Sequence, residues 1–212
     1  MSALGRGFDV SAAARALRRA DPALAGWMRR VERVEPDPRW QQPFDLVDVL
    51  ARAILYQQLS GKAAATIVSR VERACGSRRL GAASLSRVDD AGLRGCGVSQ
   101  NKLLALRDLC AHASARRLPG PKALAALDNE TIIESISAVR GIGRWTVEML
   151  LIFRLGRPDV FPHDDLGIRR GLQRLRDMEA MPPPKQAAAL AEDWAPWRSL
   201  ASLYLWRIAD SP

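Results

Sequence analysis

Apolar residues recur at helical spacing in almost every segment of this sequence. Within residues 44–58, for example, Leu46, Leu50 and Ile54 fall four positions apart, as on one face of an α-helix. No segment shows the alternation of β-branched and polar residues that is typical of a strand. The sequence therefore predicts an all-α protein with roughly ten or more helices.

Several helices are preceded by residues that favour a helix start. Ser, Asp and Asn accept hydrogen bonds from the first free N–H groups of a helix. The candidate N-caps are Ser11, Asp21, Ser60 and Ser99. Before the apolar repeat that ends at Val139, either Asp128 or Asn129 is a suitable cap.

Length and charge narrow the class of protein further. A chain of 212 residues can bury one substantial core, or two small ones that share a cleft. The formal net charge is +9, from 32 Lys and Arg against 23 Asp and Glu. This balance favours a polyanion partner through counterion release, although charge alone specifies neither a fold nor a reaction.

The cysteines and histidines limit the metal chemistry. The three cysteines, Cys75, Cys96 and Cys110, are odd in number and far apart in the sequence, so we expect reduced thiols in a cytoplasm. No cysteine follows Cys110, which excludes a C-terminal cysteine-ligated cluster. The only histidines, His112 and His163, are too few for a His-rich metal site.

The N-terminal residues lack the uninterrupted apolar stretch of a signal peptide. The longest strongly apolar run, Met149–Phe153, is far shorter than the roughly 20 residues that span a bilayer. We therefore expect a cytoplasmic protein that does not enter a membrane.

A Gly-x-Gly turn separates two helical segments at residues 139–146, Val-Arg-Gly-Ile-Gly-Arg-Trp-Thr. Gly141 and Gly143 can adopt positive φ without a Cβ penalty, so a tight helix-to-helix reversal fits here. The N–H groups of Gly143, Arg144 and Trp145 would then lie at a helix N-terminus, an arrangement that holds an anion such as a DNA phosphate. The alternative is a plain helical hairpin that binds nothing.

Two adjacent aspartates, Asp164 and Asp165, follow a proline-bearing loop after this hairpin. Helix capping is the simplest interpretation, since Asp is favourable at an N-cap and in a first turn. However, residues 139–176 carry eight arginines against four acidic residues. A carboxylate beside a phosphate-binding surface repels DNA, which favours a chemical role such as stabilising a cation or activating water. The two interpretations are compatible.

These segments together resemble a known family. The hairpin, followed about twenty residues later by an aspartate, resembles the helix–hairpin–helix DNA glycosylases that end in a Gly/Pro-rich loop and a catalytic aspartate (HhH-GPD). More narrowly, the chain is similar to the 3-methyladenine DNA glycosylase II branch. Residues 53–67, 95–110 and 194–207 resemble further segments of that branch in the same order.

The resemblance implies the site residues. The catalytic aspartate corresponds to Asp165, with Asp164 as a less certain neighbour. The base pocket is expected to include Trp145, Trp206, Met149 and Tyr204. For Trp206, burial in an apolar core is the competing interpretation. Met149 stands where the bacterial prototype of the branch has a pocket tyrosine, so the stacking surface is expected to differ. We expect no counterpart of the prototype's N-terminal β-rich domain.

The expected DNA contacts come from the hairpin and from the loop after residue 56. The hairpin residues are Arg140, Gly141, Ile142, Gly143, Arg144 and Thr146, and the loop residues are Gln57, Gln58 and Leu59. In relatives, a side chain of that loop fills the space left by an extruded nucleotide. For Gln58 the alternative is an amide that caps its own helix. The resemblance also implies a Na⁺ or K⁺ ion at the carbonyls of Ser137, Val139 and Gly141, but no other cofactor and no iron–sulfur cluster.

One position indicates the reaction class. Relatives that also cut the DNA strand carry a lysine immediately before the hairpin threonine, where its amine forms a Schiff base. Trp145 occupies that position here. The resemblance therefore implies a monofunctional hydrolase that leaves an abasic site.

The family fold implies two helical lobes with a cleft between them. We expect residues 45–155 to form the lobe with the helix–hairpin–helix, and residues 1–44 and 156–212 to form the other, with Asp165 at the cleft. The expected substrate is double-stranded DNA with alkylated bases, and the expected form is a monomer at the bacterial nucleoid. Two alternatives remain open: a glycosylase of the same fold for uracil or oxidised guanine, and a DNA-binding module without enzymatic activity.

Overall fold

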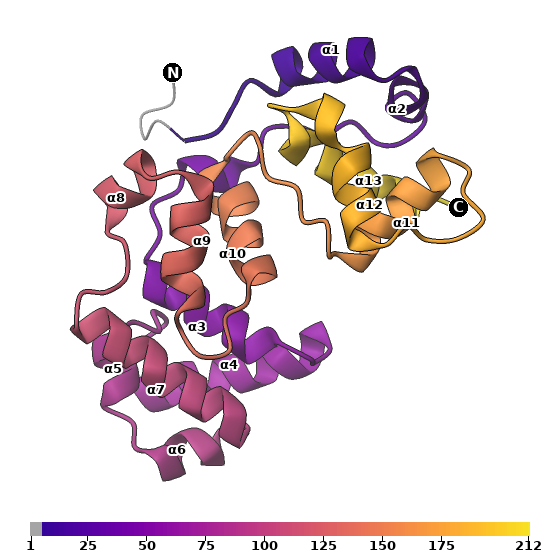
Figure 1. Cartoon of the computed structure of the whole chain (residues 1–212). Helices are drawn as coiled ribbons and strands as arrows, with labels where there is room; N and C mark the ends of the chain where they lie inside the picture. Colours follow the sequence, from indigo (N-terminus) through magenta and orange to yellow (C-terminus); the bar gives the residue numbers. More distant parts are fainter. Residues whose placement is uncertain (1–5) are drawn as a thin grey trace. The chain divides into compact units, whose positions relative to one another are not determined.

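In the computed structural model, which describes residues 6–212, every regular element is a helix (Figure 1). The expected all-α class is thus confirmed: no strand occurs within the described residues. No helix in that range is both long and apolar enough to cross a membrane.

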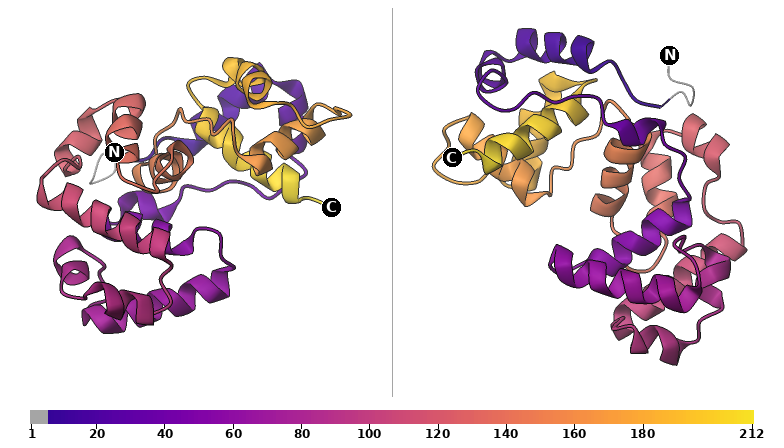
Figure 2. Two further views of the ribbon diagram at one scale, coloured as in Figure 1. Left: turned by 60° about the horizontal axis from the view of Figure 1, so that its bottom comes forward. Right: turned by 180° about the vertical axis from the view of Figure 1, so that it is seen from behind.

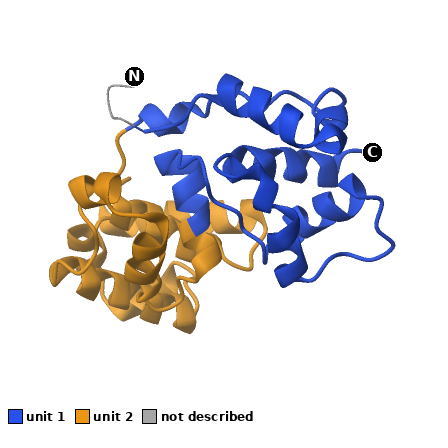
Figure 3. Ribbon diagram, turned by 45° about the horizontal axis from the view of Figure 1, so that its top comes forward, with its two compact units in different colours: residues 1–42, 148–212 blue, residues 43–147 orange. Residues whose placement is uncertain are grey.

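The chain forms two compact units (Figure 3). Unit 1 comprises Met1–Gln42 and Glu148–Pro212, and unit 2 comprises Pro43–Val147. Residues 148–155 belong to unit 1, whereas we expected them in the lobe 45–155. Their packing explains the difference, because the Trp40 indole donates to the carbonyl of Ile152 at 2.8 Å and the Gly7 N–H donates to that of Leu155 at 3.3 Å. The cleft expected between the lobes stays a prediction.

Unit 1 consists of short helices around one apolar core. They are α1 (Val10–Ala20), α2 (Pro22–Trp27), η1 (Pro38–Gln41), η2 (Leu151–Leu155), α11 (Leu166–Leu175), α12 (Pro184–Leu190), η3 (Glu192–Trp194) and α13 (Arg198–Asp210). The largest fully buried side chains of this core, Trp194 and Tyr204, come from its C-terminal part. η2 is a π-helical turn that continues directly from α10 (Arg144–Leu150).

Helices α11 and α13 are packed closely against each other and lie side by side in each view (Figures 1 and 2). Gly171 of α11 permits the contact. A Cβ atom at Gly171 would lie 2.2 Å from the carbonyl oxygen of Leu205 in α13, so only glycine fits at this backbone-to-backbone approach.

Unit 2 is also helical throughout its described elements. These are α3 (Leu46–Tyr56), α4 (Gly61–Cys75), α5 (Ala82–Ser86), α6 (Asp90–Gly95), α7 (Gln100–Ser114), α8 (Pro121–Ala126), α9 (Asn129–Ser137) and most of α10. α7 packs against α3, α5 and α6. Leu103, Leu106 and Leu109 of α7 are buried in that core.

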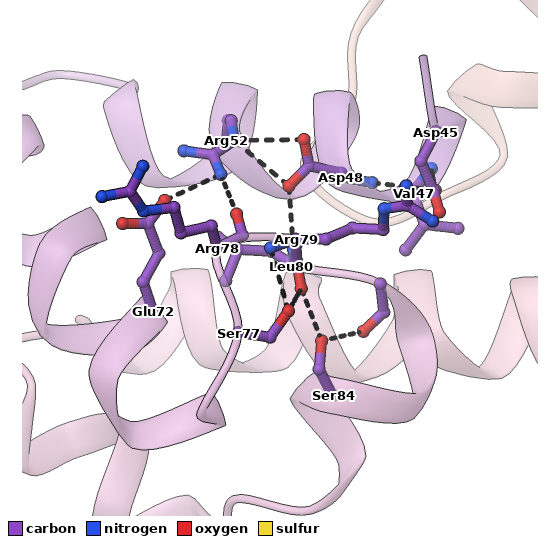
Figure 4. Close-up of polar contacts among 11 residues, drawn as sticks. Asp45, Val47, Asp48, Arg52, Glu72, Ser77, Arg78, Arg79, Leu80 and Ser84 are labelled. Atoms are coloured by element: carbon purple, nitrogen blue, oxygen red, sulfur yellow. Dashed lines mark hydrogen bonds and ion pairs between the residues drawn. The ribbon is translucent and has the colours of Figure 1, made fainter. Parts of the chain in front are cut away.

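An ion-pair network joins α3, α4 and the segment after α4 (Figure 4). Arg52 donates to Asp48 at 3.1 Å and to Glu72 at 2.8 Å, and Asp48 also accepts from the Leu80 N–H. Burial alone would lower the pKa of Arg52, but the hydrogen bonds to Asp48 and Glu72 raise it. The network therefore fixes the loop at residues 78–80 on α3.

The three cysteines are free thiols, and all are buried in unit 2. Burial raises the pKa of Cys75, and that of Cys110 rises for the same reason.

Most of the predicted helix starts are confirmed. The side chains of Asp21, Ser60 and Ser99 each accept from a backbone N–H in the first turn of the helix that follows. Asp128 rather than Asn129 caps α9. The prediction for Ser11 is wrong, because α1 begins at Val10 and the Asp9 carboxylate accepts from the Ala12 N–H at 2.8 Å.

Substitution of Gly171 by alanine should destabilise the protein. The new methyl group would overlap the Leu205 carbonyl, and overpacking of this kind costs about 1–3 kcal/mol of unfolding free energy. Chemical denaturation would measure this cost. Gly26→Ala is the matched control, because a Cβ atom at that helical position of α2 meets nothing within 4 Å. Equal stability of the two variants would contradict the close helix contact.

Candidate functional site

The Gly-x-Gly turn joins α9 to α10 as a helix–hairpin–helix. The Ile142 N–H donates to the Val139 carbonyl at 3.1 Å and the Thr146 N–H donates to the Gly143 carbonyl at 3.0 Å. Gly141 has a φ of +77°, while Gly143 does not have positive φ. The reversal therefore needs glycine for its conformation at position 141 only. At Gly143 a Cβ atom would point into open space.

The side chains of the hairpin differ in their exposure to solvent and in their partners. Arg140 is exposed, whereas Ile142 is buried and packs into unit 2. Arg144 forms an ion pair across the hairpin with Glu130 at 2.6 Å, and Thr146 is half-buried. The expected DNA contact of Ile142 is thus limited to its backbone, because its side chain belongs to the core.

The loop after α3 is linked to the hairpin within unit 2. The Gln57 amide donates to the carbonyl of Gly141 at 2.8 Å. Gln58 is exposed and has a φ of +56°, which is unusual for a residue other than glycine. Leu59 is 41% exposed. Of the three loop residues predicted to contact DNA, Gln58 and Leu59 are presented to solvent and Gln57 is engaged with the hairpin.

The expected cation ligands are the carbonyl oxygens of three alternate residues in the same hairpin, Ser137, Val139 and Gly141. The Val139 carbonyl accepts from Ile142 and the Gly141 carbonyl accepts from Gln57, but a carbonyl oxygen has two lone pairs. In the described part of the chain, the Ser137 hydroxyl is the one buried side-chain polar atom without a hydrogen-bond partner. The cation at the three carbonyls stays a prediction. No group of three or more His, Cys, Asp or Glu suited to a metal ion occurs within residues 6–212.

Asp165 is the N-cap of α11. Its Oδ1 atom accepts from the Ile168 N–H at 2.9 Å and from the indole Nε1–H of Trp206 at 2.9 Å. Asp164 is exposed and lies 3.8 Å from His163. Of the two adjacent carboxylates, Asp165 is therefore the one whose orientation the fold fixes.

Trp206 of α13 lies beside this carboxylate, half-buried. Its ring stacks on Phe153 of η2, with centroids 5.8 Å apart and an interplanar angle of 24°. The Arg39 guanidinium also lies 4.8 Å from the Phe153 ring centroid. Trp206 thus combines an apolar face with a hydrogen bond to Asp165.

Gly167 makes room for the indole. A Cβ atom at Gly167 would lie 2.7 Å from Cδ1 of Trp206 and 3.1 Å from Oδ1 of Asp165. Such a contact is closer than real Cβ atoms approach, so the indole would have to move. The hydrogen bond between Trp206 and Asp165 therefore depends on glycine at this position.

The other three residues expected in the base pocket differ in their exposure to solvent. Trp145 is 49% exposed in unit 2, and Met149 is half-buried. Tyr204 is only 1% exposed, and its hydroxyl accepts from the Val34 N–H at 3.4 Å. The prediction that Tyr204 contacts a base is wrong, because its side chain belongs to the core of unit 1.

The sequence did not identify three residues that shape these sites. Phe153 stacks on Trp206, Gly167 admits the indole, and Asp108 of α7 accepts from the Arg140 N–H at 2.8 Å. A glycine in the first turn of a helix is a weak signal of close packing. For Phe153 and Asp108 the sequence contains no such signal, because each contact depends on the tertiary arrangement.

The model of the family described as "HhH-GPD superfamily base excision DNA repair protein" matches residues 51–196. A relative in Schizosaccharomyces pombe, DNA-3-methyladenine glycosylase 1, is 37% identical over 74% of this chain and 70% of its own.

Two solved structures are similar to the chain over most of its length. The crystal structure of a DNA-3-methyladenine glycosidase from Bacillus halodurans has a TM-score of 0.84 at 32% identity, over 94% of this chain and 89% of that one. The S. pombe 3-methyladenine DNA glycosylase Mag1 in complex with abasic DNA has a TM-score of 0.79 at 33% identity, over 92% of this chain and 94% of that one.

Substitution of Gly167 by alanine should break the hydrogen bond between Trp206 and Asp165. We expect the indole N–H signal of Trp206 to shift in a ¹⁵N–¹H spectrum, where Trp206→Phe identifies it among the six tryptophans. Gly61→Ala is the control, since a Cβ atom there meets nothing within 4 Å. An unchanged Trp206 signal in Gly167→Ala would refute this dependence.

Proposed function

Because the chain belongs to the HhH-GPD superfamily of base excision DNA repair proteins, we propose that it is a monofunctional DNA glycosylase. In this proposal it hydrolyses the N-glycosidic bond of alkylated bases of the 3-methyladenine type in double-stranded DNA. The observation that carries the proposal is the Asp165 carboxylate, which α11 and Trp206 hold in one orientation. The named activities of the relatives support the substrate class.

The reaction requires access to a base that is stacked inside a duplex. The enzyme therefore flips the nucleotide outward, at a cost of a few kcal/mol for unstacking. The exposed residues Gln58 and Leu59 are suited to fill the space that the nucleotide leaves. The S. pombe glycosylase Mag1 has been solved in complex with abasic DNA, which is the product of such a reaction.

Bond cleavage then needs little acid catalysis. Alkylation at a ring nitrogen makes the base cationic, so the base leaves readily with the electron pair of the broken C1′–N bond. The sugar becomes an oxocarbenium ion, as in other glycoside hydrolyses. Asp165 stabilises this cation electrostatically and accepts a proton as the water oxygen bonds to C1′. The products are the free base and an abasic sugar.

Trp206 orients the catalytic carboxylate in this mechanism. Its indole N–H and the Ile168 N–H bind the same oxygen of Asp165, so the plane of the carboxylate is set before the substrate arrives. The stacked rings of Trp206 and Phe153 also give that carboxylate an apolar neighbour. A partly desolvated carboxylate interacts more strongly with a developing positive charge.

The hairpin contributes backbone contacts to DNA. Gly143 has no side chain, and its Cβ direction is open, so a phosphate can approach the first turn of α10. The net charge of +9 favours the same partner. A cation at the Ser137, Val139 and Gly141 carbonyls would add positive charge next to that phosphate. We further propose a monomer that acts on genomic DNA in the cytoplasm.

Substitution of Asp165 by asparagine tests the catalytic assignment. Asn keeps an oxygen for the Ile168 and Trp206 donors but loses the charge, so the single-turnover release of 3-methyladenine from methylated DNA should fall on the order of 100-fold or more. Asp164→Asn is the control, because the exposed Asp164 side chain lies outside this arrangement. Equal release rates for wild type and Asp165→Asn would refute the proposal.

The same assay separates the alternatives. Electrophoresis without alkali or heat should show intact strands, since Trp145 supplies no amine for a Schiff base. Release of uracil or oxidised guanine in place of methylated bases would support another substrate. A protein that binds intact and abasic DNA equally and releases no base would be a binding module.

Replacement of K⁺ by tetramethylammonium at constant ionic strength tests the proposed cation. The bulky ion does not fit between hairpin carbonyls, so we expect affinity for abasic-site DNA to fall about threefold through loss of one charged contact. Anisotropy titrations of wild type would measure this change. Equal affinity in both salts would show that no monovalent cation takes part.

A further inference from the structure

Two loops of unit 2 that are expected to face DNA are both attached to one helix, α7. The first is the loop after α3, at residues 57–59, and the second is the hairpin turn at residues 139–143. The attachment points, Lys102, Ala105 and Asp108, are each three residues apart. They therefore follow one side of the helix.

Lys102 holds the end of α3. Its ammonium donates to the carbonyl of Leu55 at 2.7 Å, one of the last carbonyls of that helix, which have no partner within the helix. Burial lowers the pKa of Lys102, as expected for an ammonium that lies against protein rather than in water. This lysine is thus engaged with the start of the loop that carries Gln58.

Asp108 and Ala105 hold the hairpin. The Asp108 carboxylate accepts from the Arg140 N–H at 2.8 Å and also lies 3.4 Å from Nδ1 of His112. The Cβ position of Gly141 is 3.2 Å from that of Ala105, so the turn is in close contact with the helix. A carboxylate near a phosphate-binding turn is electrostatically unfavourable for DNA binding. We therefore interpret Asp108 as a residue that holds the hairpin in place, not as one that contacts DNA.

Gln57 joins the two loops directly. Its amide donates to the Gly141 carbonyl, at the centre of the hairpin turn. The next residue, Gln58, is held at a φ of +56°, a conformation that costs free energy and persists when its surroundings fix it. The hydrogen bond of Gln57 is immediately adjacent to this strained position.

We propose that Gln57, Lys102, Ala105 and Asp108 form a brace that holds the Gln58 loop and the hairpin in one fixed arrangement before DNA binds. Gln57 and Asp108 are then positioning residues, not DNA contacts. The brace lowers the ordering cost of binding, because neither loop has to be fixed by the DNA. This inference rests on the proposed function, since it assumes that both loops meet DNA.

Two substitutions of Asp108 distinguish the brace from plain electrostatics. Loss of a negative charge near DNA should strengthen binding in both Asp108→Asn and Asp108→Ala if only charge matters. Asn keeps an oxygen acceptor for the Arg140 N–H, and Ala does not. The brace therefore predicts that Asp108→Ala binds about fivefold more weakly than Asp108→Asn.

The measurement is fluorescence anisotropy with a labelled duplex that carries one tetrahydrofuran abasic analogue. Thermal unfolding of each variant would set a temperature at which all of them are folded. Equal affinity of Asp108→Ala and Asp108→Asn would overturn the role of Asp108, and so would tighter binding by the alanine variant.

Lys102→Met and Gln57→Met test the other end of the brace. A lysine that binds phosphate changes the slope of log affinity against log salt by about 1, whereas Lys102→Met should weaken binding and leave the slope unchanged. Gln57→Met should reduce the preference for abasic over intact duplex about fivefold. The exposed residues Lys122 and Gln186 provide the controls Lys122→Met and Gln186→Met, for which we expect an unchanged preference.

The outcomes separate the two proposals. If wild type shows no preference for abasic-site duplex, the proposed function fails. If wild type shows the preference and Gln57→Met retains it in full, or if Lys102→Met lowers the salt slope by about 1, the brace alone is refuted.

Discussion

The hydrogen bond from the Trp206 indole to Asp165 joins α13 to the first turn of α11, and the proposed chemistry depends on it. The bond exists because two glycines of α11 let the helices meet. Gly171 admits the backbone of α13 and Gly167 admits the indole ring. The carboxylate is therefore oriented by helix packing, which is stiffer than a loop, and its cap position gives it a second fixed donor in Ile168. Preorganisation of this kind removes reorganisation from the reaction step.

The residues proposed to bind DNA and the residues proposed to catalyse the reaction lie in different parts of the chain. The hairpin and the Gln58 loop belong to unit 2, whereas Asp165, Trp206 and Phe153 belong to unit 1. One continuous helical segment connects the two sets, since α10 begins in the hairpin and runs directly into η2, which carries Phe153. π-helical turns such as η2 are often found at functional sites. The segment from Arg144 to Leu155 therefore contributes residues both to the hairpin proposed to bind DNA and to the surroundings of Asp165.

Much of the fold could be predicted from local sequence. Helical spacing gave the all-α class, and the capping residues Asp21, Ser60 and Ser99 marked helix starts, because these signals depend on residues a few positions apart. The assignments of the hairpin and of Asp165 came from the resemblance to the helix–hairpin–helix glycosylases, whose motif has short spacing. The assignment of Tyr204 to a pocket failed, because its burial depends on packing against Val34, 170 residues away. Phe153, Gly167 and Asp108 were not recognised for the same reason.

The role of each residue in the candidate site was harder to predict than its place in the fold. Gln57 was grouped with Gln58 as a DNA contact, yet its amide is engaged with Gly141. Neighbouring polar residues in one loop have the same propensities, so sequence does not distinguish the one that holds the loop from the one that meets a ligand. Only the tertiary partner of each side chain does so.

The burial of the cysteines of unit 2 affects how readily their thiols react with methylating reagents. Because burial raises the pKa of Cys75 and Cys110, these thiols stay protonated at neutral pH, and a protonated thiol is a poor nucleophile. Reagents that methylate DNA bases are electrophiles, and thiolates are among the groups they attack most readily in proteins. Burial of Cys75 and Cys110 therefore lowers their reactivity toward the class of reagent whose damage to DNA the protein is proposed to repair.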